Sequence, residues 1–165
     1  DGTKVLGRLE LELASEAQWE YGARAGMSTV WWTGNEKQAL AEAGNVADSY
    51  AKSHGGQAWP NHELDLDDGN TGHARVGSYR ANAFGLHDVI GNVSEWCRDG
   101  YRYDFYRQGS QRDPVSDPAD SSARVNRGGN FFSLAFIARS AVRYNALPSY
   151  SNIVLGVRPA RRISL

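Results

Sequence analysis

The chain has 165 residues, 41% hydrophobic and 22% charged, which is ordinary for a globular protein that can bury a core. Its net charge of −1 provides no basic surface for phosphate groups and disfavours a nucleic-acid partner. The single cysteine, Cys97, excludes an intrachain disulfide and a cysteine-rich metal site, and no apolar run approaches the roughly 18 residues of a membrane span.

Two elements are expected near the N-terminus. Alternating leucines in the second half of segment 5–13 predict a short strand. Ser15 stands three residues before Gln18, the spacing of a capping box in which both side chains satisfy backbone N–H groups at a helix start. The helix should run to about Arg24, with Trp19 on its buried face.

The middle of the chain predicts short elements between long loops. Residues 31–35 form a turn with tryptophan anchors, and residues 36–43 suit a short helix. Segment 44–77 is polar and rich in Gly, Asp and Asn, so we expect an ordered loop. Residues 85–99 hold a compact apolar cluster, and 124–162 should form several short strands. No linker or repeat divides the chain, which predicts one domain over residues 1–165.

The tail over residues 130–158 mixes two kinds of residue. Small and turn-forming residues recur, and between them stand thirteen residues that follow neither a strand nor a helix period. Several are large and apolar in a segment too rich in Gly, Pro and Ser to bury them all, which predicts an exposed contact surface. The alternatives are that single members belong to the core or, for the asparagines, to turns. The thirteen are Phe132, Ser133, Leu134, Phe136, Ile137, Val142, Tyr144, Asn145, Ala146, Tyr150, Asn152, Ile153 and Val154.

Three blocks occur in a fixed order: S-E-A-Q-W-E-Y-G-A-R-A-G at 15–26, G-L-H-D-V-I-G-N-V-S-E-W at 85–96 and R-V-N-R-G-G-N-F at 124–131. Together they resemble the formylglycine-generating-enzyme (sulfatase-modifying factor) family, a branch of the C-type lectin fold. The resemblance implies an α+β protein with short helices, small antiparallel sheets and much irregular loop. The family's longer N-terminal part has no counterpart here, so we expect a minimal version of that fold.

The resemblance does not carry the enzyme's chemistry with it. The formylglycine-generating enzyme needs redox-active cysteines just after the Gly-Gly-Ser motif, where this chain has the segment 130–137. Ser133 is the nearest candidate there, and a hydroxyl cannot replace a thiolate in redox chemistry or copper binding. The four histidines share no ligand spacing that would suit the related iron-dependent enzymes. We therefore expect no enzymatic activity; the alternative is an enzyme, or a degenerate enzyme, of this class.

The tail is also similar to the variable proteins of diversity-generating retroelements. Its frame A-R-S-A-x-R-x-x-x-x-P-S at 138–149 resembles the fixed frame of that family. In that family, Asn codons are randomised at their adenines. All thirteen mixed residues are among the amino acids that such randomised codons can encode. The resemblance implies a non-enzymatic ligand-binding protein with 130–158 as its variable segment. Its partner would be a protein or cell-surface ligand, and its place a virion or cell surface. A third hypothesis is a structural domain without variability.

Calcium is the one ion that the sequence suggests, and no cofactor is expected to be required. The acidic run 65–70 fails as an EF-hand because its glycine falls one place early. The family resemblance instead implies one structural calcium site at Asn45, Val46, Asp68 and Asn70 and a second at Asn92, Val93 and Glu95. In the alternative interpretation Asp68 forms only an Asx turn, and Glu95 pairs with an arginine.

Overall fold

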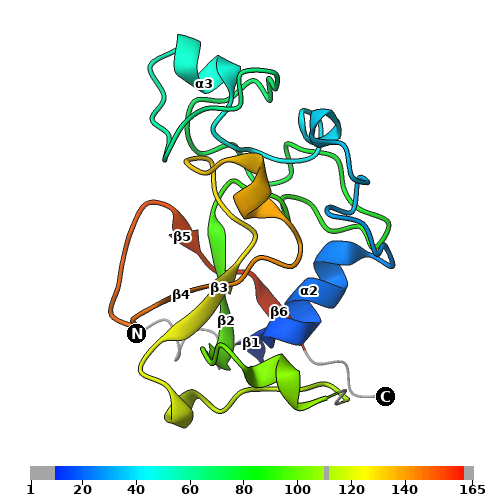
Figure 1. The fold of residues 1–165 in the computed structure, drawn as a ribbon, viewed down its shortest axis with the longest axis vertical. Helices are drawn as coiled ribbons and strands as arrows, with labels where there is room; N and C mark the ends of the chain where they lie inside the picture. The colour runs from blue at the N-terminus through cyan, green and yellow to red at the C-terminus, as the bar shows by residue number, and fades with distance from the viewer. Residues whose placement is uncertain (1–9, 110–111, 162–165) are drawn as a thin grey trace.

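The computed structural model describes residues 10–109 and 112–161. Two short α-helices, two small sheets and long ordered loops make up this part of the chain (Figure 1). The helices are α2 (Glu16–Arg24) and α3 (Ser49–Ser53). The four-stranded sheet has the order β4 (Tyr144–Ala146), β3 (Arg124–Arg127), β2 (Ser94–Gly100), β5 (Leu155–Gly156), and β1 (Leu11–Leu13) pairs with β6 (Pro159–Arg161).

The first helix confirms its sequence signature. The Ser15 hydroxyl accepts from the Gln18 N–H, and the Gln18 side chain accepts from the Ser15 N–H, which completes the capping box. The helix ends at Arg24, after which Ala25 takes a left-handed conformation with φ 48°. Trp19 is buried, as its position on the apolar face predicted. Of the predicted strand 5–13, the described part forms β1; residues 5–9 lie outside the described residues.

Three elements differ from expectation. Segment 36–43 forms only a 3-10 turn, η1 (Lys37–Leu40). The loop 44–77 contains α3, which begins where the Asp48 carboxylate accepts from the Ala51 N–H. Strand β5 is parallel to β2, whereas antiparallel sheets were expected, because the connection 147–154 crosses the sheet without reversing the chain direction. The start of α3 has a local signal, the N-cap spacing of Asp48, whereas the direction of β5 is set by pairing between distant segments, which local patterns do not contain.

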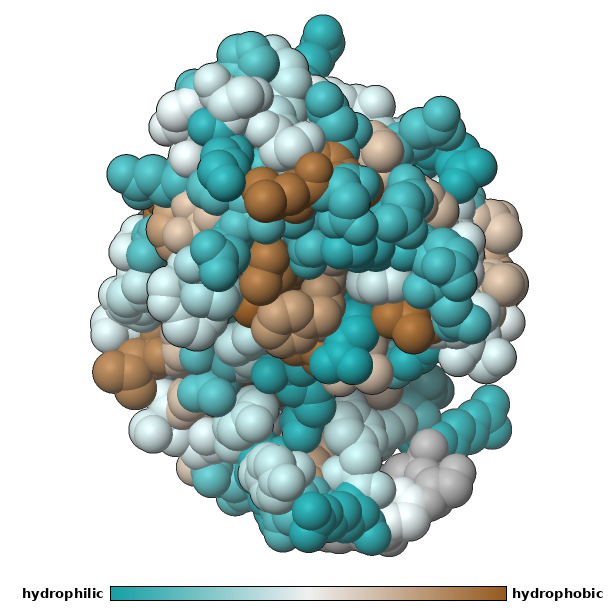
Figure 2. Space-filling model, turned by 45° about the horizontal axis from the view of Figure 1, so that its top comes forward, coloured by the Kyte–Doolittle hydropathy of each residue, from teal (hydrophilic) through white to brown (hydrophobic). Residues whose placement is uncertain are grey.

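The four-stranded sheet has two unlike faces. Side chains alternate along β3, so Val125 and Arg127 lie on the face toward α2, and Asn126 lies on the other. Val125 is fully buried in a core that also contains Trp19 and Ile90. On the surface drawn in Figure 2, hydrophobic residues show only as small groups among hydrophilic ones, consistent with an apolar core inside.

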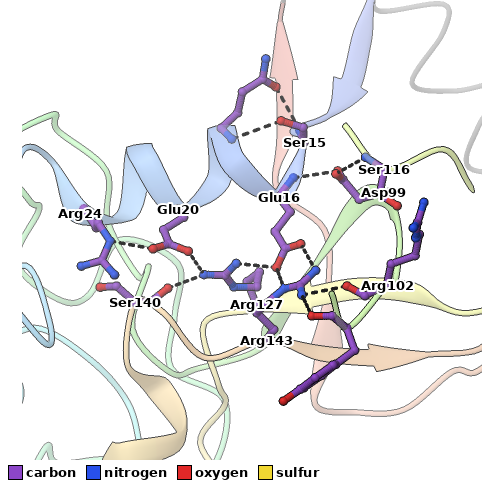
Figure 3. Close-up of polar contacts among 12 residues, drawn as sticks. Ser15, Glu16, Glu20, Arg24, Asp99, Arg102, Ser116, Arg127, Ser140 and Arg143 are labelled. Atoms are coloured by element: carbon purple, nitrogen blue, oxygen red, sulfur yellow. Dashed lines mark hydrogen bonds and ion pairs between the residues drawn. The ribbon is translucent and has the colours of Figure 1, made fainter. Parts of the chain in front are cut away.

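A buried ion network fixes the sheet face toward α2 (Figure 3). Arg127 is fully buried, and its guanidinium lies 2.7 Å from Glu16 and also donates to Glu20 and to the Ser140 carbonyl. Arg143 donates to both oxygens of Glu16, at 2.6 and 2.7 Å. The network therefore joins helix α2, strand β3 and the C-terminal tail through charge-assisted hydrogen bonds.

We expect Arg127→Leu to lower the free energy of unfolding by about 3 kcal/mol or more, since it leaves buried acceptors unpaired. Urea unfolding followed by circular dichroism measures the change. Arg161→Leu is the matched control because it removes an exposed ion pair with Glu10, and it should cost no more than about 0.5 kcal/mol. Equal losses in the two variants would contradict a structural role for the buried network.

Candidate ligand-binding pocket

A hollow of about 260 Å³ lies against the sheet, and its lining comes from all four strands, from the tail and from a distant loop. Pockets of this kind, with apolar walls and a few placed polar groups, are the usual form of ligand sites. The lining consists of Trp59, Ser94, Asn126, Asn130, Phe132, Ser133, Ile137, Tyr144, Asn145, Ala146, Tyr150, Val154 and Leu155.

The sheet supplies one wall through its face that turns away from α2. Asn126 on β3 pairs in register with Tyr144 on β4, so their side chains lie on the same face. Ser94 on β2 and Leu155 on β5 are also paired in register and also line the pocket. Strand pairing therefore sets the spacing of this wall.

A Gly-Gly turn carries the chain from β3 into the second wall. Gly129 has φ 71°, and a Cβ on it would come within 2.8 Å of Ala138, so only glycine allows this close approach. Asn130 follows, and its carboxamide donates to the Ser94 hydroxyl and accepts from the Ser133 hydroxyl at 2.9 Å. These bonds hold the start of the tail over the sheet.

The third wall is Trp59, which belongs to the loop 54–62. Its backbone N–H donates to the Phe132 carbonyl at 2.8 Å, and it forms an isolated bridge with Ser133. The indole remains 63% exposed at the pocket. A loop far away in the sequence is thus bonded to the tail and contributes the largest aromatic group of the site.

Eight of the thirteen mixed residues of the tail line this pocket. Two of the eight, Ser133 and Ile137, are almost fully buried. They line the hollow, but their burial is that of core residues. Ile137 turns inward because it lies in the 3-10 turn η4 (Ala135–Ala138), which packs under the tail. The eight are Phe132, Ser133, Ile137, Tyr144, Asn145, Ala146, Tyr150 and Val154.

The other five lie around or beside the pocket. Phe136 and Ile153 are exposed, at 52% and 68%. Asn152 is exposed and donates to the Tyr150 hydroxyl at 2.7 Å, so it supports a lining residue. Leu134 and Val142 are half-buried. The predicted surface is therefore partly a pocket, lined by eight of the thirteen residues, and partly exposed side chains outside its lining.

Five lining residues were not predicted from the sequence: Trp59, Ser94, Asn126, Asn130 and Leu155. Nothing near Trp59 in the sequence indicates a site, because the loop reaches the tail only through tertiary contacts. Asn126 stands inside the motif R-V-N-R-G-G-N-F, which carries the family resemblance. Its position between the inward-facing Val125 and Arg127 is a signal of period two that could have placed it on the opposite face.

The pocket contains no charged side chain, and its polar groups are amides and hydroxyls. The one cysteine of the chain, Cys97, is buried in the core, and burial raises the pKa of its thiol, which leaves it protonated and inert. What the pocket offers to a ligand is therefore apolar contact and hydrogen bonds.

The residues of the first suggested calcium site lie together in the structure. Asp68 accepts from the Val46 and Asn70 N–H groups, and Asp48, also buried, lies beside it. Burial, and secondarily the charge of Asp48, raise the pKa of Asp68 to about 7, and no cationic side chain bonds to either carboxylate within the described part of the chain. The buried Oδ1 of Asn45 has no partner. Oxygen-rich groups without a counterion fit a hard cation.

In the second suggested site, the one carboxylate already has a cationic partner. Both oxygens of Glu95 accept from Arg158, and one also accepts from the Trp19 indole at 2.7 Å. The Asn92 carboxamide bonds to the backbone of Ala74, and Val93 is half-buried next to it. Glu95 therefore takes the alternative role of an ion-pair partner. Among the described residues, no three His, Cys, Asp or Glu side chains are grouped as metal ligands.

With this geometry established, the chain can be compared with known proteins. Residues 3–163 match the family described as sulfatase-modifying factor enzyme 1-like domain. The chain belongs to this family. The formylglycine-generating-enzyme type of fold that the sequence predicted is thereby confirmed, with two short helices, small sheets and much loop.

The curated relatives of this domain include enzymes of different kinds. Formylglycine-generating enzyme of Streptomyces coelicolor is 33% identical over 93% of this chain and 47% of its own length. Serine/threonine-protein kinase pkn1 of Chlamydia pneumoniae is 32% identical over 92% of this chain and 21% of its own length. The chain thus spans about half or less of these relatives.

Two solved structures share the fold closely. PvdO from Pseudomonas aeruginosa superposes with a TM-score of 0.78 at 26% identity, over 98% of this chain and 57% of PvdO. Treponema denticola variable protein 1 superposes with a TM-score of 0.74 at 28% identity, over 93% of this chain and 48% of that protein. The same scaffold therefore occurs in proteins with different names and roles.

We propose that this sulfatase-modifying factor-like domain holds structural calcium at Asp68. Calcium at about 100 times its Kd should then raise the midpoint of thermal unfolding by about 5 °C or more over the midpoint in chelator. Asp68→Asn should abolish the difference, and Asp67→Asn, which changes a neighbouring exposed carboxylate, should retain it. A wild-type midpoint that is the same in calcium and in chelator would count against the site.

Proposed function

We propose that this domain is a non-enzymatic ligand-binding protein whose tail, residues 130–158, is diversified by a retroelement. The observation that carries the proposal is the pocket: eight of the thirteen mixed residues come together in one hollow. Chance scatter along an irregular tail would distribute such residues between core and surface. The likeness in fold to Treponema denticola variable protein 1 supports the same function.

The tail contains structural residues and exposed residues at different positions, which supports the proposal further. The residues of the fixed frame hold the backbone: Ala138 and Ser140 are buried, at 1% and 5% exposure, and Arg143 binds Glu16. The mixed residues Tyr144 and Asn145 project from an edge strand and are exposed. A rigid scaffold that presents replaceable side chains is the arrangement by which loops change specificity without unfolding a domain.

The enzyme alternative has less support in the pocket. Ser133 lies where the redox chemistry of the formylglycine-generating enzyme would need a thiol, and its hydroxyl is bonded to Asn130. Cys97 lies next to Trp96 in β2, in the core and away from the lining residues. The named enzymes among the relatives are longer than this chain, which covers 21% and 47% of two of them, so their activities are not assigned to it.

Exchanges at mixed positions should be tolerated, and exchanges in the frame should not. Tyr144→Asn is expected to change the free energy of unfolding by no more than about 0.5 kcal/mol because the side chain is exposed. Ala138→Leu should cost about 1–3 kcal/mol by overpacking against Gly129. Urea midpoints measure both, and an equal cost at the two positions would argue against a replaceable surface.

The diversification itself is tested in DNA. We expect a reverse-transcriptase gene near this coding sequence and a second copy of the region encoding 130–158 that is rich in Asn codons. Independent isolates should differ at the thirteen mixed positions and agree at the frame positions Ala138, Arg143 and Pro148. Isolates that vary equally at both sets, or a locus with no second copy, would refute diversification by a retroelement.

A further inference from the structure

The base of the pocket contains a polar group with no partner. Asn126 is 4% exposed, and its carboxamide makes no hydrogen bond with any residue of 10–109 and 112–161. The backbone of Asn126 is paired in the sheet on both sides, which fixes the face of the sheet on which its side chain lies. The amide is not among the unpaired side-chain atoms that are sealed from solvent, so it opens into the pocket, where a ligand with a matching group could bond to it.

Several polar groups of the pocket are already engaged. Asn130 bonds to Ser94 and Ser133, and the Ser94 hydroxyl donates to the Gly129 carbonyl. In the described part of the chain, the lining groups without a hydrogen bond are the Asn126 and Asn145 amides, the Tyr144 hydroxyl and the Trp59 indole N–H. Of these residues, Asn126 alone is almost fully buried, so it is the polar group best placed to meet the tip of a ligand that enters the pocket.

The walls above Asn126 are aromatic and aliphatic. Trp59, Phe132, Tyr144 and Tyr150 surround the opening. Aromatic rings pack favourably against another ring in edge-to-face or offset arrangements. No charged side chain lines the hollow, so a carboxylate, phosphate or ammonium group would lose its hydration without gaining a counterion.

We propose that this pocket binds the side chain of a tyrosine that a protein partner presents. The proposal rests on the function proposed above and names its ligand class. A phenol ring fits within a hollow of about 260 Å³ with mostly apolar walls, and its hydroxyl is both donor and acceptor, as is the Asn126 carboxamide. A phenylalanine would leave the amide unpaired, which is the situation that polar sites reject most strongly.

Exposed apolar side chains near the pocket suit a protein partner. Phe136, Leu147 and Ile153 are all more than half exposed, and each is next in the chain to a lining residue; Trp59 adds an exposed indole to the lining itself. Exposed apolar side chains beside a pocket are typical of interfaces in which one buried anchor residue provides most of the binding energy.

The anchor site would not change between diversified copies. Asn126 and Trp59 both lie outside 130–158. The preference for tyrosine would therefore stay constant, while the mixed residues of the tail select the surroundings in which that tyrosine is presented. In this arrangement all copies would share the contact with the anchor tyrosine, and the residues of the tail would determine which partner binds.

The test uses N-acetyl-tyrosinamide and N-acetyl-phenylalaninamide as probes, with NMR of the whole chain as the readout. We expect the tyrosine probe to shift the Asn126 side-chain amide and Trp59 indole signals saturably, with a Kd about tenfold lower than that of the phenylalanine probe. In Asn126→Leu the preference should reverse, because the apolar side chain no longer needs a hydroxyl. Asn61→Leu is the matched control, since Asn61 is exposed and lies outside the pocket lining; it should keep the wild-type preference.

The wild-type comparison alone decides the matter if Asn126→Leu fails to fold. Equal affinity for the two probes, or no shift at about 50 mM of either, would overturn the tyrosine site. Methyl glucoside serves as a third probe, and tighter binding of it than of the tyrosine probe would overturn the site in favour of a carbohydrate. The outcomes separate from those for the proposed function: isolates that vary at the mixed positions would uphold diversification even if the tyrosine probe failed, and invariant isolates would refute it even if that probe bound.

Discussion

The fold depends on one buried arginine. Arg127 is inaccessible to water; its two terminal nitrogens donate to the carboxylates of Glu16 and Glu20 and to the Ser140 carbonyl, its Nε has no partner, and the guanidinium lies over the ring of Trp19 at 5.4 Å. A charge in such a place is tolerated only when nearly all its hydrogen bonds are made. The three segments that supply them are therefore fixed relative to one another, and the sheet takes its position from this constraint.

The sheet therefore has one face that packs into the core and, in the proposed function, one face beside which side chains can be replaced. Charges, core residues and Cys97 are gathered on the side of α2, and the opposite side carries Asn126 and the pocket. Because stability comes mainly from the first side, substitutions on the second are not expected to unfold the protein. This separation is the physical basis on which a scaffold shared with enzymes can instead serve recognition.

The chemistry of the pocket follows from what the scaffold leaves there. At the position where a redox enzyme of this family would place a thiol, Ser133 takes part in a hydrogen-bond chain with Asn130 and Ser94. That chain stabilises the tail and uses up hydroxyl groups that could otherwise bind a ligand. The proposed binding would rely on aromatic contact and on the unpaired amide of Asn126, a combination that favours an amphipathic ligand over a charged one.

The sequence by itself determined the local and compositional features. The capping box of Ser15 and Gln18, the turn at Gly129 and the lack of a second thiol follow from residue types and their spacing, which act over a few residues. The separation of frame from mixed residues in the tail also came from the sequence. Only the tertiary structure decided that Trp59 meets the tail and that Asn126 forms the base of a pocket. Those positions depend on strand register and on pairing between distant segments, which no local pattern encodes.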